Sequence, residues 1–218
     1  MVKYKIIDNF LSDADFSTLT NNISPLPLDS PYPVAKPSFG WDYTHCQLKE
    51  FNEEAKGWVK STTNDEQDRF KKVTDIQVLD PIHDWYMQHM VQTGNYYSNA
   101  MQYFGALLGR INPLALFQIR ANLTVQQEKR GRTIFHIDYK GAHATSMITS
   151  IFYLNTTNGP TILEDGTEIE CRANRLVSYG YQTYHAAVLC TDQPYRIVIN
   201  FNYFKDEEND ETPNSERV

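Results

Sequence analysis

The hydrophobic pattern of the chain changes its period near Asn112-Pro113. Beyond that point apolar and polar residues alternate over 117–124, 145–155 and 195–203. Alternation with a period of two predicts strands that have one apolar face and one mixed or polar face. Turn-forming residues separate these segments, at Asn158-Gly159-Pro160, Glu164-Asp165-Gly166, Gly180 and Asp192-Gln193-Pro194. The second half of the chain is therefore expected to be a series of short strands.

The first half has a mixed pattern. Residues 4–7 resemble a short strand, and Ser12 is a suitable N-cap for a helix with an apolar side of Phe16, Leu19 and Ile23. Five prolines between Ser24 and Ser38 exclude a regular helix there and favour an irregular segment over 24–43. We further expect a short surface helix over 49–59, and two helices from Asp84 to Leu108 that are divided at Gly94-Asn95.

These patterns predict an α+β fold that is mainly β. We expect a double-stranded β-helix (jelly roll) with N-terminal helices packed on one sheet. The apolar strand faces would meet the helices, and the polar faces would line a pocket inside the roll. One domain would span 1–204, with a helical part over about 1–112 and the jelly-roll core over about 113–204. Residues 205–218 are acidic and poor in apolar residues, which predicts a disordered tail.

Composition narrows the function classes. The 218 residues are 41% hydrophobic, which is ordinary for a globular domain, and the formal net charge of −7 disfavours nucleic-acid and anionic-membrane partners. The three cysteines (Cys46, Cys171 and Cys190) form no close pair, which favours free thiols in a reducing compartment. The N-terminus has no apolar leader segment, so we expect a cytoplasmic protein.

One group of residues points to chemistry. His136 and Asp138 are two positions apart, so on a strand both side chains project from one face. His185 follows in a later predicted strand, and Arg196 lies on the inward face of the last one. Two imidazoles and one carboxylate suit a non-haem Fe(II) site. A buried guanidinium needs an anion, and 2-oxoglutarate could chelate the iron at its keto-acid end and pair with Arg196 at the other.

Each of these residues also has a structural interpretation. His136 could be a core histidine bonded to Asp138, His185 could lie at the surface, and Arg196 could pair with a structural glutamate. His143 is a rival metal ligand, although its spacing from Asp138 and the neighbouring Gly141 favour a loop. The combination of all three interpretations is less plausible than a site, because perturbed charges gather at functional sites.

The segment from about 114 to 204 resembles the prolyl 4-hydroxylase-like branch of the Fe(II)/2-oxoglutarate dioxygenases. The matching pieces are Arg120-Ala-Asn122-Leu-Thr, Phe135-His136-Ile-Asp138, Ser150-Ile-Phe-Tyr153-Leu-Asn155, Gly159-Pro-Thr161, Asn174-Arg175-Leu-Val, His185-Ala and Arg196-Ile-Val-Ile-Asn200. The opening Tyr4 to Ser12 also looks like the start of such chains. In place of the usual Gly-Gly-Glu-Thr this chain has Asn158-Gly-Pro160-Thr161, which changes a turn and leaves the metal ligands intact.

The resemblance implies roles for individual residues. His136, Asp138 and His185 would bind iron, Arg196 would bind the distal carboxylate of 2-oxoglutarate, and Tyr153 would hydrogen-bond the same carboxylate. Thr149 and Asn122 are weaker candidates for the co-substrate pocket.

The implied reaction uses Fe(II), 2-oxoglutarate and O2, with ascorbate as a candidate reductant. It would yield succinate and hydroxylate a C–H bond of a peptide, such as a prolyl residue, or of a small molecule. One alternative is a nucleic-acid oxidative demethylase of the same superfamily, which the acidic charge and the lack of a second arginine soon after Arg196 disfavour. The other is a non-oxidative, cupin-like metal-binding module, which does not require Arg196.

Overall fold

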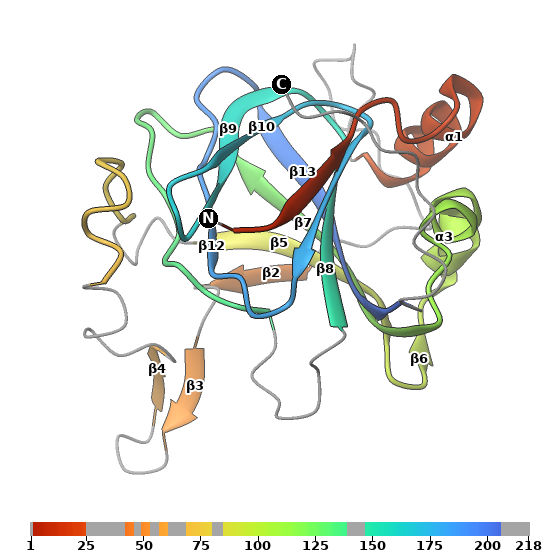
Figure 1. The fold of residues 1–218 in the computed structure, drawn as a ribbon, viewed down its shortest axis with the longest axis horizontal. Coiled ribbons are helices and arrows are strands. Elements are labelled where there is room, and N and C mark those ends of the chain that lie inside the picture. The colour runs from red at the N-terminus through yellow and green to blue at the C-terminus, as the bar shows by residue number, and fades with distance from the viewer. Residues whose placement is uncertain are drawn as a thin grey trace.

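The computed structural model describes residues 2–24, 42–45, 49–52, 57–60, 69–79, 85–138 and 147–205, of which 42–45, 49–52, 57–60 and 85–86 are described by their backbone alone. The main sheet contains eight strands: β1 (Tyr4–Ile7), β2 (Asp42–His45), β5 (Trp85–Thr93), β6 (Tyr96–Tyr97), β7 (Ala115–Val125), β8 (Met147–Tyr153), β11 (Arg175–Gly180) and β13 (Tyr195–Phe204). A second sheet contains β9 (Thr157–Leu163), β10 (Glu168–Cys171) and β12 (His185–Ala187), and a separate hairpin pairs β3 (Lys49–Asn52) with β4 (Gly57–Lys60). The helices are α1 (Asp13–Ile23), the 3-10 helix η1 (Asn99–Phe104) and α3 (Gly105–Ile111) (Figure 1).

The main sheet is antiparallel and runs in the order β1-β11-β8-β13-β7-β5-β2, with β6 paired to β5. Its centre is β13, which pairs with β8 on one side and β7 on the other. Arg196, Val198, Asn200 and Asn202 of β13 share one face, and the residues between them share the opposite face. The strands predicted over 4–7, 117–124 and 195–203 are confirmed, and the one predicted over 145–155 is confirmed as β8 over Met147–Tyr153, with 145–146 outside the described residues.

The second sheet lies across the roll from the main sheet. Its order is β10-β9-β12, and the segment 131–136 extends it beyond β12 through isolated bridges of Arg132 with Val188 and His136 with His185. Residue 78 pairs in turn with Arg132, in parallel. The predicted jelly roll is confirmed by this arrangement of two sheets.

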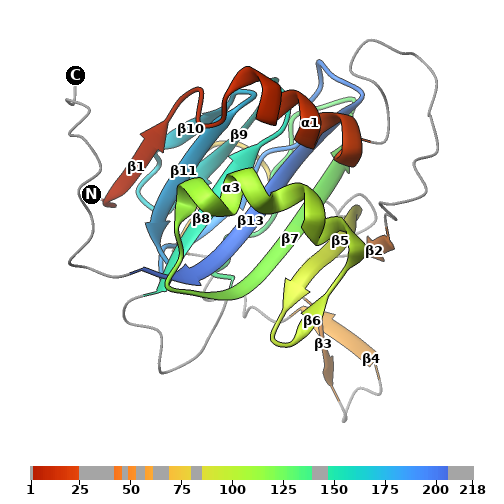
Figure 2. The same ribbon diagram turned by 90° about the vertical axis from the view of Figure 1, so that its right-hand side faces the viewer.

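Helices cover the apolar face of the main sheet, as expected. Ser12 caps α1 by accepting a hydrogen bond from the Asp15 amide. The buried Leu19 and Ile23 of α1 and Leu107 and Ile111 of α3 belong to the same hydrophobic cluster as the sheet residues Phe152, Leu176, Ile197, Ile199 and Phe201. Figure 2 shows α1 and α3 lying across this face. Among the described residues no helix is both long and apolar enough to cross a membrane.

Two helix predictions are wrong. Residues 49–52 and 57–60 form a hairpin in which Phe51 pairs with Trp58, since aromatic and β-branched residues on either side of a short connection favour paired strands over a helix. Residues 85–93 form a strand instead of a helix because β5 completes the hydrogen bonding of β7, with Met87 opposite Leu123 and His89 opposite Ala121. The apolar residues from Trp85 to Val91 fit a period of two as well as a helical one, and sheet pairing decides between them.

The second of the two helices predicted between Asp84 and Leu108, the one after Gly94-Asn95, is partly confirmed. Residues 96–97 form the short strand β6, whereas η1 and α3 are helical over 99–111. The proline-rich 25–41 and the acidic 206–218 lie outside the described residues. A single domain over 1–204 stays a prediction.

An ion pair fastens the N-terminal strand to the sheet. The Arg175 guanidinium is buried and donates two hydrogen bonds to the Asp8 carboxylate, one of them 3.0 Å long. The neighbouring Asn174 side chain bonds both the amide and the carbonyl of Leu11, at 2.8 and 2.9 Å. The hydrogen bonds from Arg175 hold the pKa of Asp8 below its ordinary value of 3.8.

We expect Asp8→Ala to lower the free energy of unfolding by about 1–2 kcal/mol at neutral pH, since a buried guanidinium loses its partner while the half-exposed Asp8 limits the effect. Because the pKa of Asp8 is depressed in the folded protein, the contribution is present above pH 4 and is lost as the pH falls further. Urea unfolding at pH 7 and pH 3 measures both effects. Glu170→Ala removes a more exposed carboxylate, 3.8 Å from Arg175, and should cost less than Asp8→Ala. Equal losses from the two variants would contradict this assignment.

Candidate metal centre

The backbone of the second sheet brings two histidines together. His136 and His185 face each other in an antiparallel bridge, in which each amide donates to the other's carbonyl at 3.0 and 2.9 Å. Their rings are consequently 4.5 Å apart between centroids. Asp138, two residues after His136, has Oδ1 3.8 Å from Nε2 of each histidine. One ligand atom from each of the three residues lies within 4.8 Å of the others, so the group could hold a metal ion.

Backbone carbonyls orient both imidazoles. Nδ1 of His136 donates to the Ile134 carbonyl at 3.1 Å, and Nδ1 of His185 donates to the Thr183 carbonyl at 3.2 Å. A neutral ring that donates from Nδ1 keeps the lone pair on Nε2, which is the atom that faces Asp138. Burial, together with the positive charge of His185, lowers the pKa of His136 to about 4. His136 is therefore neutral at physiological pH, the form that a metal ligand requires.

Asp138 is a buried carboxylate with unused acceptors. Within the described part of the chain neither of its oxygens accepts a hydrogen bond, and the side chain is 1% exposed. Burial opposes its ionisation, but attraction to Arg120 and to the charged forms of His185 and His136, together with the nearby Asn202 side chain, outweighs burial and holds its pKa below 3.8. The Arg120 guanidinium is the nearest permanent cation, with Nη2 3.7 Å from Oδ1. An ionised, buried carboxylate without hydrogen bonds is costly unless a cation completes its environment.

Arg196 projects into the same cavity from β13. Its side chain is buried, and it donates to the Gly159 carbonyl at 2.8 Å and to Thr161 Oγ1 at 3.0 Å. The Tyr153 hydroxyl also donates to Thr161 Oγ1, at 2.8 Å, and burial raises the pKa of Tyr153 to about 12. Among the described residues no carboxylate lies within ion-pair distance of Arg196. The structural glutamate considered as an alternative partner is thus not found among them.

A cavity between the two sheets joins these groups. It is lined by Arg120, Asn122, Thr124, His136, Ile151, Thr161, His185, Ala187, Arg196, Val198 and Asn200. The cavity is narrow, at about 30 Å³, which is room for one or two water molecules. Side-chain oxygens of Asn122, Thr124 and Asn200 have no hydrogen-bond partner within the described ranges. A polar ligand would therefore meet unused acceptors as well as the two arginines.

The structure places the predicted residues as follows. His136, Asp138 and His185 come together, and Arg196 and Asn122 line the cavity beside them. Tyr153 reaches the cavity through Thr161, and its ring lies 5.6 Å from the Arg196 guanidinium. Thr149 is not among the lining residues, because its hydroxyl is fully buried and donates to Asn202 Oδ1 at 2.9 Å. His143 lies outside the described residues.

Sequence reasoning missed three residues of the site. Arg120 shares a strand face with Asn122, so the alternation of that strand could have identified it. Thr161 belongs to the Gly159-Pro-Thr161 motif, which could have identified it in the same way. Tyr179 packs its ring 5.3 Å from the ring of His185, and its hydroxyl has no partner in the described part of the chain. Only the pairing of β11 with β8 brings Tyr179 to the site, and no signal in the sequence indicates it.

Solved structures share this fold. A non-haem α-ketoglutarate-dependent epimerase from nogalamycin biosynthesis, SnoN, has a TM-score of 0.55 at 12% identity, with 100% of this chain and 87% of that chain covered. AviO1 from Streptomyces viridochromogenes Tue57 has a TM-score of 0.53 at 8% identity, covering 94% and 91%. A prolyl hydroxylase from Trichoplax adhaerens, in complex with a peptide of a hypoxia inducible factor, has a TM-score of 0.50 at 15% identity, covering 92% and 83%.

These likenesses concern the fold. The expected resemblance to Fe(II)/2-oxoglutarate oxygenases, prolyl hydroxylases included, is confirmed at that level. No family model matches the sequence, and no curated protein matches it.

The backbone at Gly159, whose carbonyl accepts a hydrogen bond from Arg196, lies close to the backbone at Val188. A Cβ at Gly159 would lie 2.5 Å from the Val188 carbonyl oxygen and 3.3 Å from Cδ of Arg196. We expect Gly159→Ala to lower the free energy of unfolding by about 1–3 kcal/mol, because the backbone of the second sheet must shift. Gly109→Ala is the matched control, since its Cβ would meet nothing within 4 Å, and it should not destabilise the protein. Chemical denaturation compares the two, and an unaffected Gly159→Ala variant would refute the close approach.

Proposed function

We propose that this chain is an Fe(II)- and 2-oxoglutarate-dependent oxygenase that binds iron through His136, Asp138 and His185. The observation that carries the proposal is one cavity with two complementary ends. Three ligand atoms converge at one end, and a buried guanidinium with no carboxylate partner among the described residues stands at the other. A diacid with a keto group next to one carboxylate matches both ends.

The three ligand residues fit iron. Two imidazoles and one carboxylate, arranged with open positions, suit non-haem Fe(II) oxygenases better than structural zinc, which takes four protein ligands. A divalent cation would also satisfy the carboxylate of Asp138, whose oxygens lack hydrogen bonds within the described part of the chain. Iron held there supplies the chemistry that couples reduction of O2 to decarboxylation of 2-oxoglutarate and oxidation of a substrate.

The other end would hold the distal carboxylate of 2-oxoglutarate. Arg196 supplies the charge, and its planar fork suits a carboxylate. Thr161 Oγ1 already accepts two hydrogen bonds, from Tyr153 and Arg196, so its own proton is available to donate. Because the high pKa of Tyr153 keeps its hydroxyl protonated, it continues to donate to Thr161 and holds this orientation.

Part of the cavity wall is apolar. Ile151, Ala187 and Val198 line it and would contact the methylene carbons of the diacid. The cavity must widen to admit the molecule. Arg120 is the lining residue suited to move, because its side chain is 22% exposed and its contact with Asp138 is only an ion pair at 3.7 Å.

We propose hydroxylation of a C–H bond in a peptide or small molecule as the outcome, with a prolyl residue as one candidate. Neighbours of the same fold support both substrate classes, since one is a prolyl hydroxylase bound to a peptide and another is an epimerase from nogalamycin biosynthesis. A shared fold does not fix the substrate, so candidate peptides and small molecules must be compared directly for substrate-stimulated succinate release.

His136→Ala and Asp138→Ala test the metal ligands. We expect each to reduce succinate formation from 2-oxoglutarate by at least about 100-fold, because loss of one of three ligands removes the metal or its geometry. Metal content after dialysis against Fe(II) without oxygen should fall in parallel. Full succinate formation by either variant would refute this ligand set, whereas a normal metal content without 2-oxoglutarate binding in the wild type would favour a cupin-like module.

Thr161→Val and Thr149→Val form a matched pair. We expect Thr161→Val to weaken 2-oxoglutarate binding by roughly 10–100-fold, through the loss of a hydrogen bond to a charged group, with metal binding unchanged. Thr149→Val should leave the affinity unchanged, because Thr149 is not among the residues that line the cavity and its hydroxyl donates to Asn202. Calorimetric titration with 2-oxoglutarate distinguishes them, and the reverse order would restore the role predicted for Thr149 from the sequence.

A further inference from the structure

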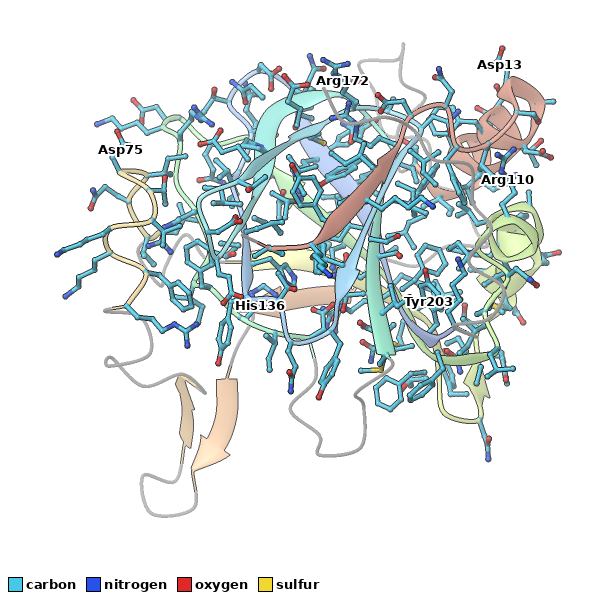
Figure 3. All side chains as sticks on the ribbon, in the orientation of Figure 1. Asp13, Asp75, Arg110, His136, Arg172 and Tyr203 are labelled. Atoms are coloured by element: carbon cyan, nitrogen blue, oxygen red, sulfur yellow. The ribbon has the colours of Figure 1, made fainter. Side chains whose placement is uncertain are left out.

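A second pocket lies on the opposite face of the main sheet from the candidate metal centre. It has a volume of about 330 Å³, within the range of pockets that hold small molecules. Its floor and walls come from β1, β11, β8, the end of β13 and α3. Figure 3 shows Arg110 and Tyr203, which line it, on the helix side of β8, while His136 lies on the other side. We call it the basic groove, after Lys3, Lys5, Arg110 and Lys205.

The charge of the groove has one sign. Among the described residues its lining includes these four basic residues and no aspartate or glutamate, although the chain as a whole carries −7. Arg110 stacks on the ring of Phe10, with Cζ 5.1 Å from the ring centroid, which holds the guanidinium at the rim. Lys3 and Lys5 form no ion pair with another described residue. A concentration of positive charge around a hollow attracts an anion.

The inside of the groove is apolar. Ile7, Phe10, Ile111, Ile148 and Leu176 line it, and Phe10, Ile111 and Leu176 are at most 5% exposed. These side chains lie below the level of the basic residues, so they suit a chain that enters the groove better than a flat membrane surface, which would require protruding apolar side chains. Ser178 and the Tyr203 hydroxyl add polar contacts at the floor; Tyr203 bonds Ser150 at 3.1 Å.

We propose that the basic groove binds an amphipathic monoanion, namely a free long-chain carboxylate. Its hydrocarbon chain would lie on the apolar floor, and its carboxylate would meet Lys3 and Lys5 at the open edge of β1. Two features of the groove support this occupant over a purely ionic one: the charge complementarity of the rim and the apolar character of the floor. The site does not depend on the oxygenase chemistry proposed for the other face.

A glycine in the groove provides a clean test. Gly180 lies at the end of β11, opposite Ile148, and a Cβ added there would meet nothing within 4 Å. Gly180→Leu should therefore fill the groove without straining the fold. Gly109, on α3 and outside the groove lining, offers a control with equally open space, so Gly109→Leu adds the same side chain elsewhere.

The experiment is calorimetric titration of the full chain with laurate below its micellar concentration. We expect saturable binding at one site, abolished in Gly180→Leu, unchanged in Gly109→Leu and weakened at least tenfold in the double variant Lys3→Gln/Lys5→Gln. Dodecyltrimethylammonium, which has the same chain length but a positive head group, should not bind. Added salt should weaken the binding of laurate, because the rim is exposed to solvent.

Several results would overturn the proposal. These are the absence of saturable laurate binding, equal binding of the cationic amphiphile, and binding that Gly180→Leu leaves intact. Laurate binding only in a full-length variant with Asp206, Glu207, Glu208, Asp210 and Glu211 changed to their amides would instead assign the groove to the acidic segment 206–218. Retention on phosphatidylglycerol vesicles without binding of free laurate would assign it to a membrane surface.

Discussion

Two main-chain hydrogen bonds between His136 and His185 set the geometry on which the site depends. They belong to the second sheet, and they fix two residues that are distant in sequence directly opposite each other. The side chains follow from this pairing, because residues opposed across an antiparallel bridge project to the same face. Carbonyls of Ile134 and Thr183 then fix the ring orientation. Asp138 completes the group because it follows His136 by two positions.

The main sheet supplies the other half of the site through its two unlike faces. On β13 every second residue packs against the helices. The intervening residues, among them Arg196, Asn200 and Asn202, point into the roll. This alternation allows one strand to belong to a hydrophobic core and to a polar cavity at once. Arg120 and Arg196 line the cavity, and Asp138 is the carboxylate that the described residues bring beside it. Such an excess of positive charge favours a diacid over a neutral ligand.

Strand parity and motif spacing were sufficient to predict β1, β7, β8 and β13, the jelly roll, and the convergence of His136, Asp138, His185 and Arg196. They failed for 85–93, where a helical and a strand period fit the same residues and the pairing with β7 decides. They also failed for Tyr179, because only the pairing of β11 with β8 brings this residue to the site. Thr149 shows the opposite error, in which a residue was assigned to the pocket and does not line it. It was predicted as a candidate for the co-substrate pocket, but its hydroxyl donates to Asn202, a contact that periodicity does not reveal.

The central claim is that one cavity holds a metal ion and 2-oxoglutarate together, each in contact with its own set of side chains. Thermodynamic linkage makes that claim measurable, because two ligands that contact each other must change each other's affinity by the same factor. The direct measurement is anaerobic titration of 2-oxoglutarate into the metal-free protein and into the Fe(II)-loaded protein. We expect Fe(II) to tighten the binding of 2-oxoglutarate at least tenfold, and 2-oxoglutarate to tighten the binding of Fe(II) equally. An affinity for 2-oxoglutarate that is the same with and without Fe(II) would contradict the claim.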